Sequence, residues 1–219
     1  MPIVNRLLPE LPVPSLDAYI EAGGGRALPA ARAIDPGTLI EEITASGLRG
    51  RGGAGFPSGR KWATVQANRS PVVPSTVVVN GAEGEPGCFK DRMILRYDPY
   101  RVIEGALIAA YAVGADSVVI GMKRAFEPEI GRVRRAIKEM TDRGWLGAVT
   151  VDVVEGPSEY LFGEETALLE VIDGRYPFPR LAPPFRRGVD EVVESAGDVA
   201  DETSSAAHVE LAGSTGETV

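Results

Sequence analysis

The spacing of hydrophobic residues along the chain alternates several times between short continuous runs, typical of buried strands, and the spacing of one helix face. Short runs of β-branched and apolar residues at 75–80, 117–122 and 149–155 predict buried strands. Apolar residues spaced as on one face of a helix predict helices between and around these strands. The predicted helices span residues 36–46, 99–113, 128–143 and 164–172. Strands that alternate with helices are typical of a parallel sheet, so we expect an α/β fold with flanking helices.

Composition and hydrophobic pattern divide the chain into three parts. Residues 1–33 are rich in proline, glycine and alanine, and we expect an extended arm with one short helix near 16–22. Residues 34–188 hold the alternating strands and helices and form the expected α/β domain. Residues 189–219 are rich in acidic and small residues and contain few large apolar ones, so we expect a mobile, low-complexity tail.

Composition argues against several classes of function. The net charge of −8 does not supply the positive field that nucleic-acid binding requires. With one cysteine, Cys88, and one histidine, His208, the chain holds no four-cysteine zinc or iron–sulfur site, so we expect no metal and no cluster in it. No run approaches the roughly 18 apolar residues of a membrane span, so we expect no direct membrane insertion. The lack of a cysteine pair agrees with a reducing cytoplasm, which is the expected location.

The segment Gly50–Gly55 matches the pattern G-x-G-x-x-G. It follows a predicted helix, whereas the Rossmann fingerprint needs a strand before it, so an ordinary dinucleotide loop is not favoured. Its glycines still let backbone N–H groups approach a ligand closely. The surrounding cations suit a phosphate or the edge of a flavin ring; they are Arg49, Arg51, Arg60 and Lys61. A flexible surface loop is the alternative.

Two acidic segments follow predicted strands. Residues 80–87 (NGAEGEPG) come directly after the first strand, and residues 160–166 (YLFGEET) join the last strand to the last helix. Ligands of parallel α/β folds bind beyond the carboxyl ends of the strands. Carboxylates there suit ligand hydroxyls such as those of ribitol or ribose, and the helix start of the second segment suits an anion or a carbonyl. The alternatives are an exposed polar turn and acids that stabilise a first helical turn.

Three long motifs, taken in order, resemble the NADH-oxidising flavoprotein subunit of respiratory complex I. They are GLRGRGGAGFPSGRKW, VVNGAEGEPGCFKDR and YLFGEETALLE. The same module occurs in NAD-reducing hydrogenases and NAD-dependent formate dehydrogenases. The resemblance covers residues 39–185 and implies a Rossmann-like α/β domain that holds FMN.

The resemblance also implies a set of ligand-binding residues. Those that would hold FMN are Gly50, Arg51, Gly52, Lys61, Asn80, Glu83, Tyr160, Gly163, Glu164 and Glu165. Those that would contact NADH are Phe56, Glu85 and Phe185, with the two phenylalanines resting against its adenine. Glu85 and Glu165 would orient the nicotinamide nucleotide, and Lys61 would favour a negatively charged reduced flavin. NADH would pass a hydride to flavin N5 without a side-chain acid or base, because the cofactor supplies the redox chemistry.

Several positions depart from the family pattern. Ala82 stands where the family has an aspartate, Ala182 where it has a lysine, and Thr64 where it has an aromatic residue. The first change would weaken FMN binding and the other two fall in the dinucleotide site, where each lost hydrogen bond costs on the order of 1 kcal/mol. The family's asparagine-rich flavin motif, ubiquitin-like domain and four-cysteine [4Fe–4S] domain are not recognisable in this sequence.

Three functions remain open from the sequence. The first is an FMN-dependent oxidoreductase domain that takes a hydride from NADH and passes electrons to a partner protein. A thioredoxin-like [2Fe–2S] subunit is the candidate partner. The second is a catalytically reduced paralogue that serves as a binding or regulatory subunit. The third is a flavoenzyme that does not use nicotinamide.

Overall fold

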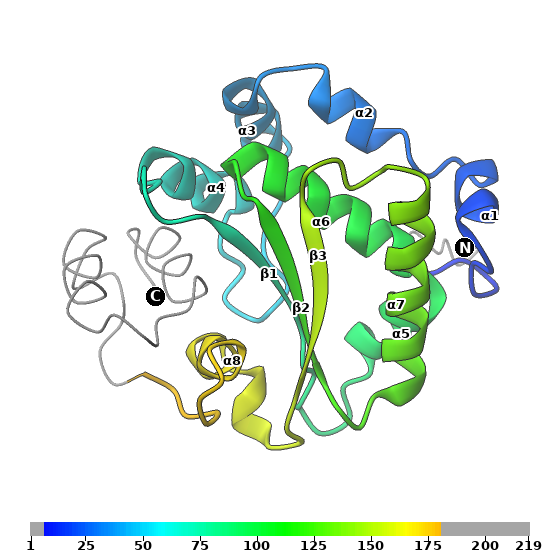
Figure 1. Ribbon diagram of the computed structural model, residues 1–219, viewed down its shortest axis with the longest axis vertical. Helices are drawn as coiled ribbons and strands as arrows, with labels where there is room; N and C mark the ends of the chain where they lie inside the picture. Colours follow the sequence, from blue (N-terminus) through cyan, green and yellow to red (C-terminus); the bar gives the residue numbers. More distant parts are fainter. Residues whose placement is uncertain (1–6, 181–219) are drawn as a thin grey trace, which may run out of the picture.

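A parallel sheet lies at the centre of the structure, a computed structural model that describes residues 7–180. Within this range its strands run in the order β1 (Thr76–Gly81), β2 (Ser117–Lys123) and β3 (Thr150–Gly156), all parallel (Figure 1). The bounds agree with the three predicted strands to within one residue, so the hydrophobic runs located the sheet correctly. The expected α/β fold is confirmed.

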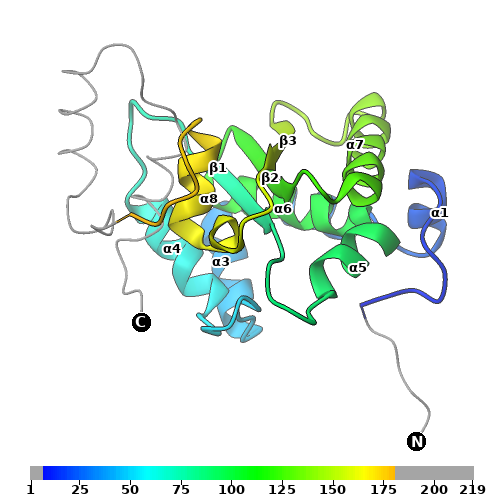
Figure 2. The same ribbon diagram turned by 90° about the horizontal axis from the view of Figure 1, so that it is seen from below.

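Two groups of helices cover the two faces of this sheet. Helices α6 (Pro99–Val113) and α7 (Glu127–Asp142) lie on one face, and α8 (Glu165–Ile172) lies on the other (Figures 1 and 2). Alternate residues of β1 serve the two sides: Val77 and Val79 pack against the larger core and Val78 against a smaller cluster under α8. This alternation follows from the two-residue period of a strand.

Two glycines in the strands let the α8 side pack closely. A Cβ on Gly121 would stand 2.4 Å from Leu168 Cδ1, and one on Gly156 would stand 2.1 Å from Phe162 Cζ. Phe162 belongs to the 3₁₀-helix η1 (Tyr160–Gly163), which follows β3. Because Gly121 and Gly156 have no side chain, η1 and α8 pack directly against the sheet. This packing places the third sequence motif beside the second.

Helix ends follow the expected capping chemistry. In α3 (Pro36–Ala45) the Asp35 carboxylate accepts a hydrogen bond from Thr38 N–H, with proline at the first helical position. Helix α6 ends at Gly114, whose φ of 64° is left-handed. Helices α4 (Ser58–Ala67) and α5 (Lys90–Tyr97) were not predicted from the sequence.

The N-terminal segment differs from the expected extended arm. It contains the predicted short helix, α1 (Leu16–Glu21), and a second one, α2 (Ala27–Arg32). The carboxylate of Glu104 on α6, itself 4% exposed, fixes both helices to the core. It accepts hydrogen bonds from Tyr19 Oη (2.6 Å), Gly25 N–H (3.0 Å) and Leu28 N–H (2.9 Å). The buried acid on a distant helix is the physical reason why this segment is packed.

Some expectations concern residues beyond the described range. The predicted tail 189–219 lies there, as do Ala182, Phe185 and His208. Within residues 7–180 no helix has the length and apolar character needed to cross a membrane. The same residues contain no cluster of three or more histidine, cysteine, aspartate or glutamate side chains suited to a metal ion.

Candidate functional site

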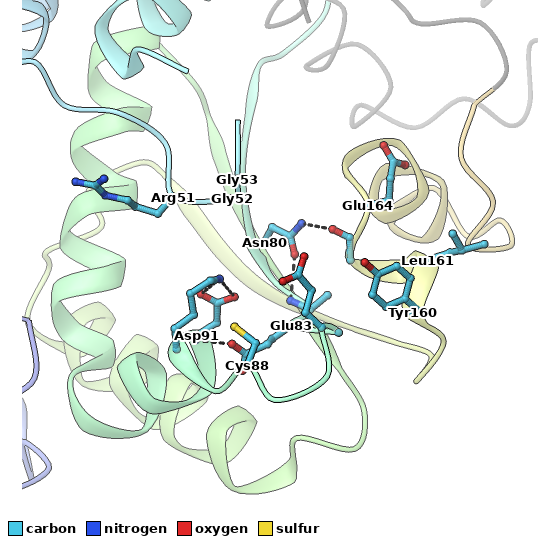
Figure 3. A pocket seen from close by; sticks show the side chains of 15 residues that line it. Arg51, Gly52, Gly53, Asn80, Glu83, Cys88, Asp91, Tyr160, Leu161 and Glu164 are labelled. Carbon is cyan, nitrogen blue, oxygen red and sulfur yellow. Dashed lines mark hydrogen bonds and ion pairs between the residues drawn. The ribbon is translucent and has the colours of Figure 1, made fainter. Parts of the chain in front are cut away.

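A cavity of about 670 Å³ lies beyond the carboxyl ends of the strands (Figure 3). Ligand and cofactor sites commonly measure about 300–1,000 Å³, so the cavity has room for a nucleotide-sized cofactor. Three parts of the chain line it: the glycine-rich loop, the segment after β1 with the start of α5, and η1 with the residue after it. The lining residues are Arg51, Gly52, Gly53, Asn80, Ala82, Glu83, Gly84, Glu85, Cys88, Lys90, Asp91, Tyr160, Leu161, Gly163 and Glu164.

The three sequence motifs therefore meet around one cavity. The predicted site residues that line it are Arg51, Gly52, Asn80, Glu83, Glu85, Tyr160, Gly163 and Glu164. Four other predicted residues, Gly50, Phe56, Lys61 and Glu165, are not part of the lining. Phe185 lies outside the described residues.

Asn80 joins the second motif to the third. Its Nδ2 donates to the carbonyl oxygen of Gly163 at 2.8 Å, and its Oδ1 accepts from Ala82 N–H at 3.1 Å (Figure 3). Gly163 also lies close to Ala82, because a Cβ on Gly163 would stand 3.1 Å from Ala82 O. Asn80 thus fixes the wall of the cavity, while one Nδ2–H and one lone pair of Oδ1 remain for a ligand.

Glu83 holds the start of α5 in place. Its side chain is 3% exposed and accepts hydrogen bonds from Asp91 N–H (3.1 Å), Arg92 N–H (3.5 Å) and Arg92 Nε (3.3 Å). Burial acts to raise the pKa of Glu83, but these bonds and one with Cys88 outweigh it and lower the pKa. The acid is therefore ionised, and part of its hydrogen-bonding capacity is already used within the protein.

Ala82 lines the cavity but offers it no polar side-chain group. It is fully buried and belongs to an apolar cluster with Phe162 and Leu168. The position at which the resembling family has an aspartate therefore supports the contact between β1 and the α8 side of the sheet. Any hydroxyl of a ligand in this part of the cavity must be bound by other groups.

The glycine-rich loop is closed at its neck and open at its tip. Gly50 N–H donates to Phe56 O at 2.8 Å, and Arg49 Nη1 donates to Gly55 O at 3.1 Å. At the tip, a Cβ on Gly52 or Gly53 would meet no protein atom within 4 Å. The backbone of the tip is therefore accessible from the cavity, which is the arrangement that a close backbone contact to a ligand needs.

Charged side chains surround the cavity without making it basic. Arg51 and Lys90 line it together with four acids, Glu83, Glu85, Asp91 and Glu164. The Arg51 guanidinium extends away from Asn80 and Glu83 (Figure 3). Lys90 Nζ contacts Asp91 at 2.7 Å. The excess of carboxylates suits hydroxyl and N–H groups of a ligand, and the glycine-loop amides suit an anion.

Lys61 and Glu165 form an ion pair beside the cavity. Their charged atoms lie 3.0 Å apart and link α4 to α8, with the two side chains 48% and 57% exposed. Phe56 lies under a cation instead, with Arg60 Cζ 5.8 Å from its ring centroid. Lys61 and Glu165, to which the resemblance assigned contacts with ligands, thus contact each other in this structure.

Sequence reasoning missed Lys90, Asp91 and Leu161. The first two stand at the N-terminus of α5, and their signal was the KDR string that closes the second motif. Cys88 is a free, partly exposed thiol in the cavity wall.

The residues present fit a flavin nucleotide. The loop tip supplies backbone N–H groups in open space, and the acids after β1 and around η1 supply acceptors for hydroxyls. The size of the cavity and its position at the carboxyl edge of a parallel sheet agree with this ligand class.

A known protein family matches the part of the chain that contains the cavity-lining residues. Residues 43–210 match the family model described as the Nuo51 FMN-binding domain. The chain belongs to this family. All three cavity-lining segments fall within the matched range, and FMN is the cofactor that gives the family its description.

Relatives of known name cover the same part of the chain. It is 39% identical over 181 residues to an NADH-quinone oxidoreductase subunit of Aquifex aeolicus, covering 79% of this chain and 42% of the relative. The protein of the same name in Rickettsia bellii is 44% identical over 158 residues, which cover 68% of this chain and 37% of the relative. The chain thus spans about two fifths of the length of these members of the Nuo51 family.

A solved structure shares the fold. The NAD⁺-reducing [NiFe]-hydrogenase in its H₂-reduced state superimposes with a TM-score of 0.68 at 31% sequence identity. The superposition covers 85% of this chain and 34% of the hydrogenase chain. Most of this protein therefore shares its fold with about a third of the hydrogenase chain.

Proposed function

We propose that this chain binds FMN in the cavity and accepts a hydride from NADH, then passes electrons to a partner protein. The single observation that carries the proposal is the meeting of the three motifs around one cavity of suitable size. Membership of the Nuo51 family and the names of the relatives support the choice of FMN and NADH.

In this proposal the glycine loop and the two acidic segments hold different parts of FMN. The open tip at Gly52 binds through its backbone N–H groups, and Glu164, Tyr160 and the free capacity of Asn80 bind polar groups of the flavin nucleotide. When bound, FMN supplies the hydride acceptor. The protein contributes position and electrostatics, so no side chain needs to act as an acid or base.

The NADH-binding residues lie at the edge of this arrangement. Glu85 is exposed and lines the cavity, which makes it available to a second ligand. Lys61 and Glu165 must exchange their mutual ion pair for contacts with FMN and NADH. An exposed pair of this kind contributes about 0–1 kcal/mol, so its loss is a small barrier to binding.

The partner and location are part of the proposal. The relatives are named as subunits, and a [2Fe–2S] protein of thioredoxin-like fold is the electron acceptor that we propose. We place the protein in the cytoplasm, since NADH is available there and the single cysteine, Cys88, agrees with a reducing compartment.

A second candidate is a flavin-binding protein that does not oxidise NADH. It is favoured by one observation: Phe56 and Glu165 are not part of the cavity lining, and Glu165 is engaged by Lys61. This candidate keeps the FMN site and loses only the nicotinamide site.

Anaerobic mixing of the FMN-loaded chain with NADH separates these candidates. Loss of flavin absorbance is the expected result, because hydride transfer reduces the flavin. Bound flavin that keeps its absorbance with NADH, but loses it with dithionite, would contradict NADH oxidation and support the second candidate.

The Glu85→Gln variant tests whether the exposed acid Glu85 binds NADH. The change should slow reduction by NADH by about tenfold, the effect of one charge-assisted hydrogen bond, and leave the FMN dissociation constant nearly unchanged. Glu42→Gln, at an exposed position of α3, is the matched control. Equal losses of FMN binding and NADH reduction would show that Glu85 serves the flavin and not the nicotinamide.

A further inference from the structure

Lys123 is a buried cation at the carboxyl edge of the sheet. It is the last residue of β2, the central strand, and is 6% exposed. The strands on either side, β1 and β3, lead into two of the three segments that line the cavity, residues 80–91 and 160–164 (Figure 1). Lys123 therefore occupies the middle position of the edge on which the site is built.

The ammonium lies directly behind the cavity wall. A Cβ on Gly84 would stand 3.0 Å from Lys123 Nζ and 3.3 Å from Tyr160 O. Both Gly84 and Tyr160 line the cavity, whereas Lys123 does not. The backbone of Gly84, which carries no side chain, thus separates the Lys123 ammonium from the cavity.

Residues 7–180 provide an acceptor for only part of the hydrogen-bonding capacity of the Lys123 ammonium. Nζ donates to Ser158 O at 3.2 Å, and no carboxylate oxygen of residues 7–180 forms an ion pair with it. Glu159 attracts the charge over a longer distance and Arg92 repels it. Of the three N–H donors of an ammonium, two have no acceptor among these residues.

A buried and unpaired ammonium is unfavourable in free energy. Removal of a charge from water costs several kcal/mol unless an opposite charge compensates for it. Burial accordingly lowers the pKa of Lys123. Of the four acids that line the cavity, Glu83 is bound to α5, Asp91 to Lys90 and Glu164 to the start of α8, and Glu85 is exposed. None of these four forms an ion pair with Lys123, so a negative charge held in the cavity would compensate for it.

We propose that Lys123 is a positioning residue that makes the cavity favour the reduced, anionic form of FMN over the oxidised form. This inference rests on the proposed function. Hydride transfer moves two electrons and one proton from NADH to FMN and yields NAD⁺ and a reduced flavin with one more negative charge. The Lys123 charge, held behind Gly84, stabilises that added charge, and its bond to Ser158 O ties the end of β2 to the segment between β3 and η1.

The midpoint potential of bound FMN tests this assignment. Lys123→Met removes the charge at similar volume, and we expect reduced FMN to bind on the order of tenfold more weakly while oxidised FMN changes little. A tenfold change for a two-electron couple lowers the potential by about 30 mV. Lys123→Arg should restore the wild-type potential, since it keeps the charge. Lys138→Met, which removes an exposed lysine of α7, is the control and should leave the potential unchanged.

Two further variants separate charge from structure. Lys123→Gln keeps a donor for Ser158 O without the charge and should lower the potential as Met does. Gly84→Ala keeps the lysine and places a methyl group 3.0 Å from Nζ, so the ammonium must shift by a few tenths of an ångström and the potential should change less than in the neutral variants.

Each result decides between the two proposals. A wild-type potential in Lys123→Gln or Lys123→Met overturns the role of Lys123 and leaves FMN binding intact. Failure of the wild-type chain to bind FMN overturns the proposed function and, with it, this inference. A lower potential in the neutral variants and its recovery in Lys123→Arg support the assignment.

Discussion

The N-terminal segment and the glycine-rich loop are alike in sequence and opposite in structure. Both are rich in glycine, and neither carries a strong hydrophobic period. The N-terminal segment is fixed by one buried and one partly exposed acid: Glu104 accepts three hydrogen bonds from it, and Glu139 accepts one from Leu16 N–H at 2.8 Å. The tip of the glycine loop, at Gly52 and Gly53, has open space where side chains would be.

This difference shows how a glycine-rich segment acquires its role. A distant element that supplies a polar partner makes the segment part of the core. Where no protein group meets the segment, its backbone donors remain for a ligand. The two segments should therefore respond to mutation in opposite ways: the first through stability, the second through FMN affinity.

Glu104→Ala should give the largest effect. It leaves the donors of Tyr19, Gly25 and Leu28 without their acceptor, and each buried unsatisfied group costs about 1–3 kcal/mol. We expect a loss of roughly 3 kcal/mol or more in the free energy of unfolding. For a chain of this size that lowers Tm by about 2–4 °C per kcal/mol. Chemical and thermal denaturation measure both quantities.

Tyr19→Phe is the graded control for this change. It removes one of the three donors, so it should cost about 1 kcal/mol. FMN affinity should stay at the wild-type value in every variant that folds. A Glu104→Ala protein as stable as wild type would mean that the N-terminal segment is not held by this acid.

Gly52→Leu should affect FMN and not stability. The added side chain enters open space at the loop tip, so the free energy of unfolding should change by less than about 0.5 kcal/mol. FMN should bind at least tenfold more weakly, which is about 1.4 kcal/mol, because the side chain obstructs the backbone contact. Fluorescence titration with FMN measures the loss.

Gly131→Leu is matched to this variant. Gly131 is exposed on α7, and a Cβ there also meets no protein atom within 4 Å. Its substitution should leave FMN affinity unchanged. An equal loss of affinity in both variants would show that the effect does not arise at the loop tip.

Alkaline pH should weaken the contact between α6 and α7. Tyr100 Oη donates to Glu139 Oε2 at 2.8 Å, and burial together with this acceptor raises the pKa of Tyr100 from 10.0 to about 12. The protonated phenol is the form that folding favours, so its contribution is complete below pH 10 and is lost as pH rises through about 12. The loss by about pH 11 should be roughly 1 kcal/mol.

Tyr100→Phe provides the comparison for this pH dependence. The variant lacks the ionisable group, so the fall in its unfolding free energy between about pH 9 and pH 11 should be smaller than that of wild type by roughly 1 kcal/mol. Parallel pH profiles for the two proteins would contradict the raised pKa of Tyr100.

The sheet and the place of the site could be predicted from the sequence. Runs such as 75–80 and 117–122 carry an intrinsic signal for buried strands, and parallel strands bring their carboxyl ends to one edge. What surrounds that edge depends on contacts between distant residues. Helix α5 is one example, since Glu83 stabilises its start from outside the helix.

The remaining misses have the same physical origin. Nothing local in the sequence indicates that Glu104 would bind residues 19–28, because the partners are about 80 positions away. The ion pair between Lys61 and Glu165 likewise joins residues 104 positions apart. Sequence patterns located the three strands and the longer helices, whereas the pairing of these charges arises only when the sheet brings the elements together.

An equilibrium titration of the full chain with FMN tests the central claim most directly. The cavity at the edge of β1 and β3 should quench flavin fluorescence in a saturable manner, with equimolar binding, and Gly52→Leu should shift the curve to higher FMN concentration while Gly131→Leu does not. A folded wild-type chain that leaves the fluorescence of added FMN unchanged would contradict the claim that this cavity is a flavin site.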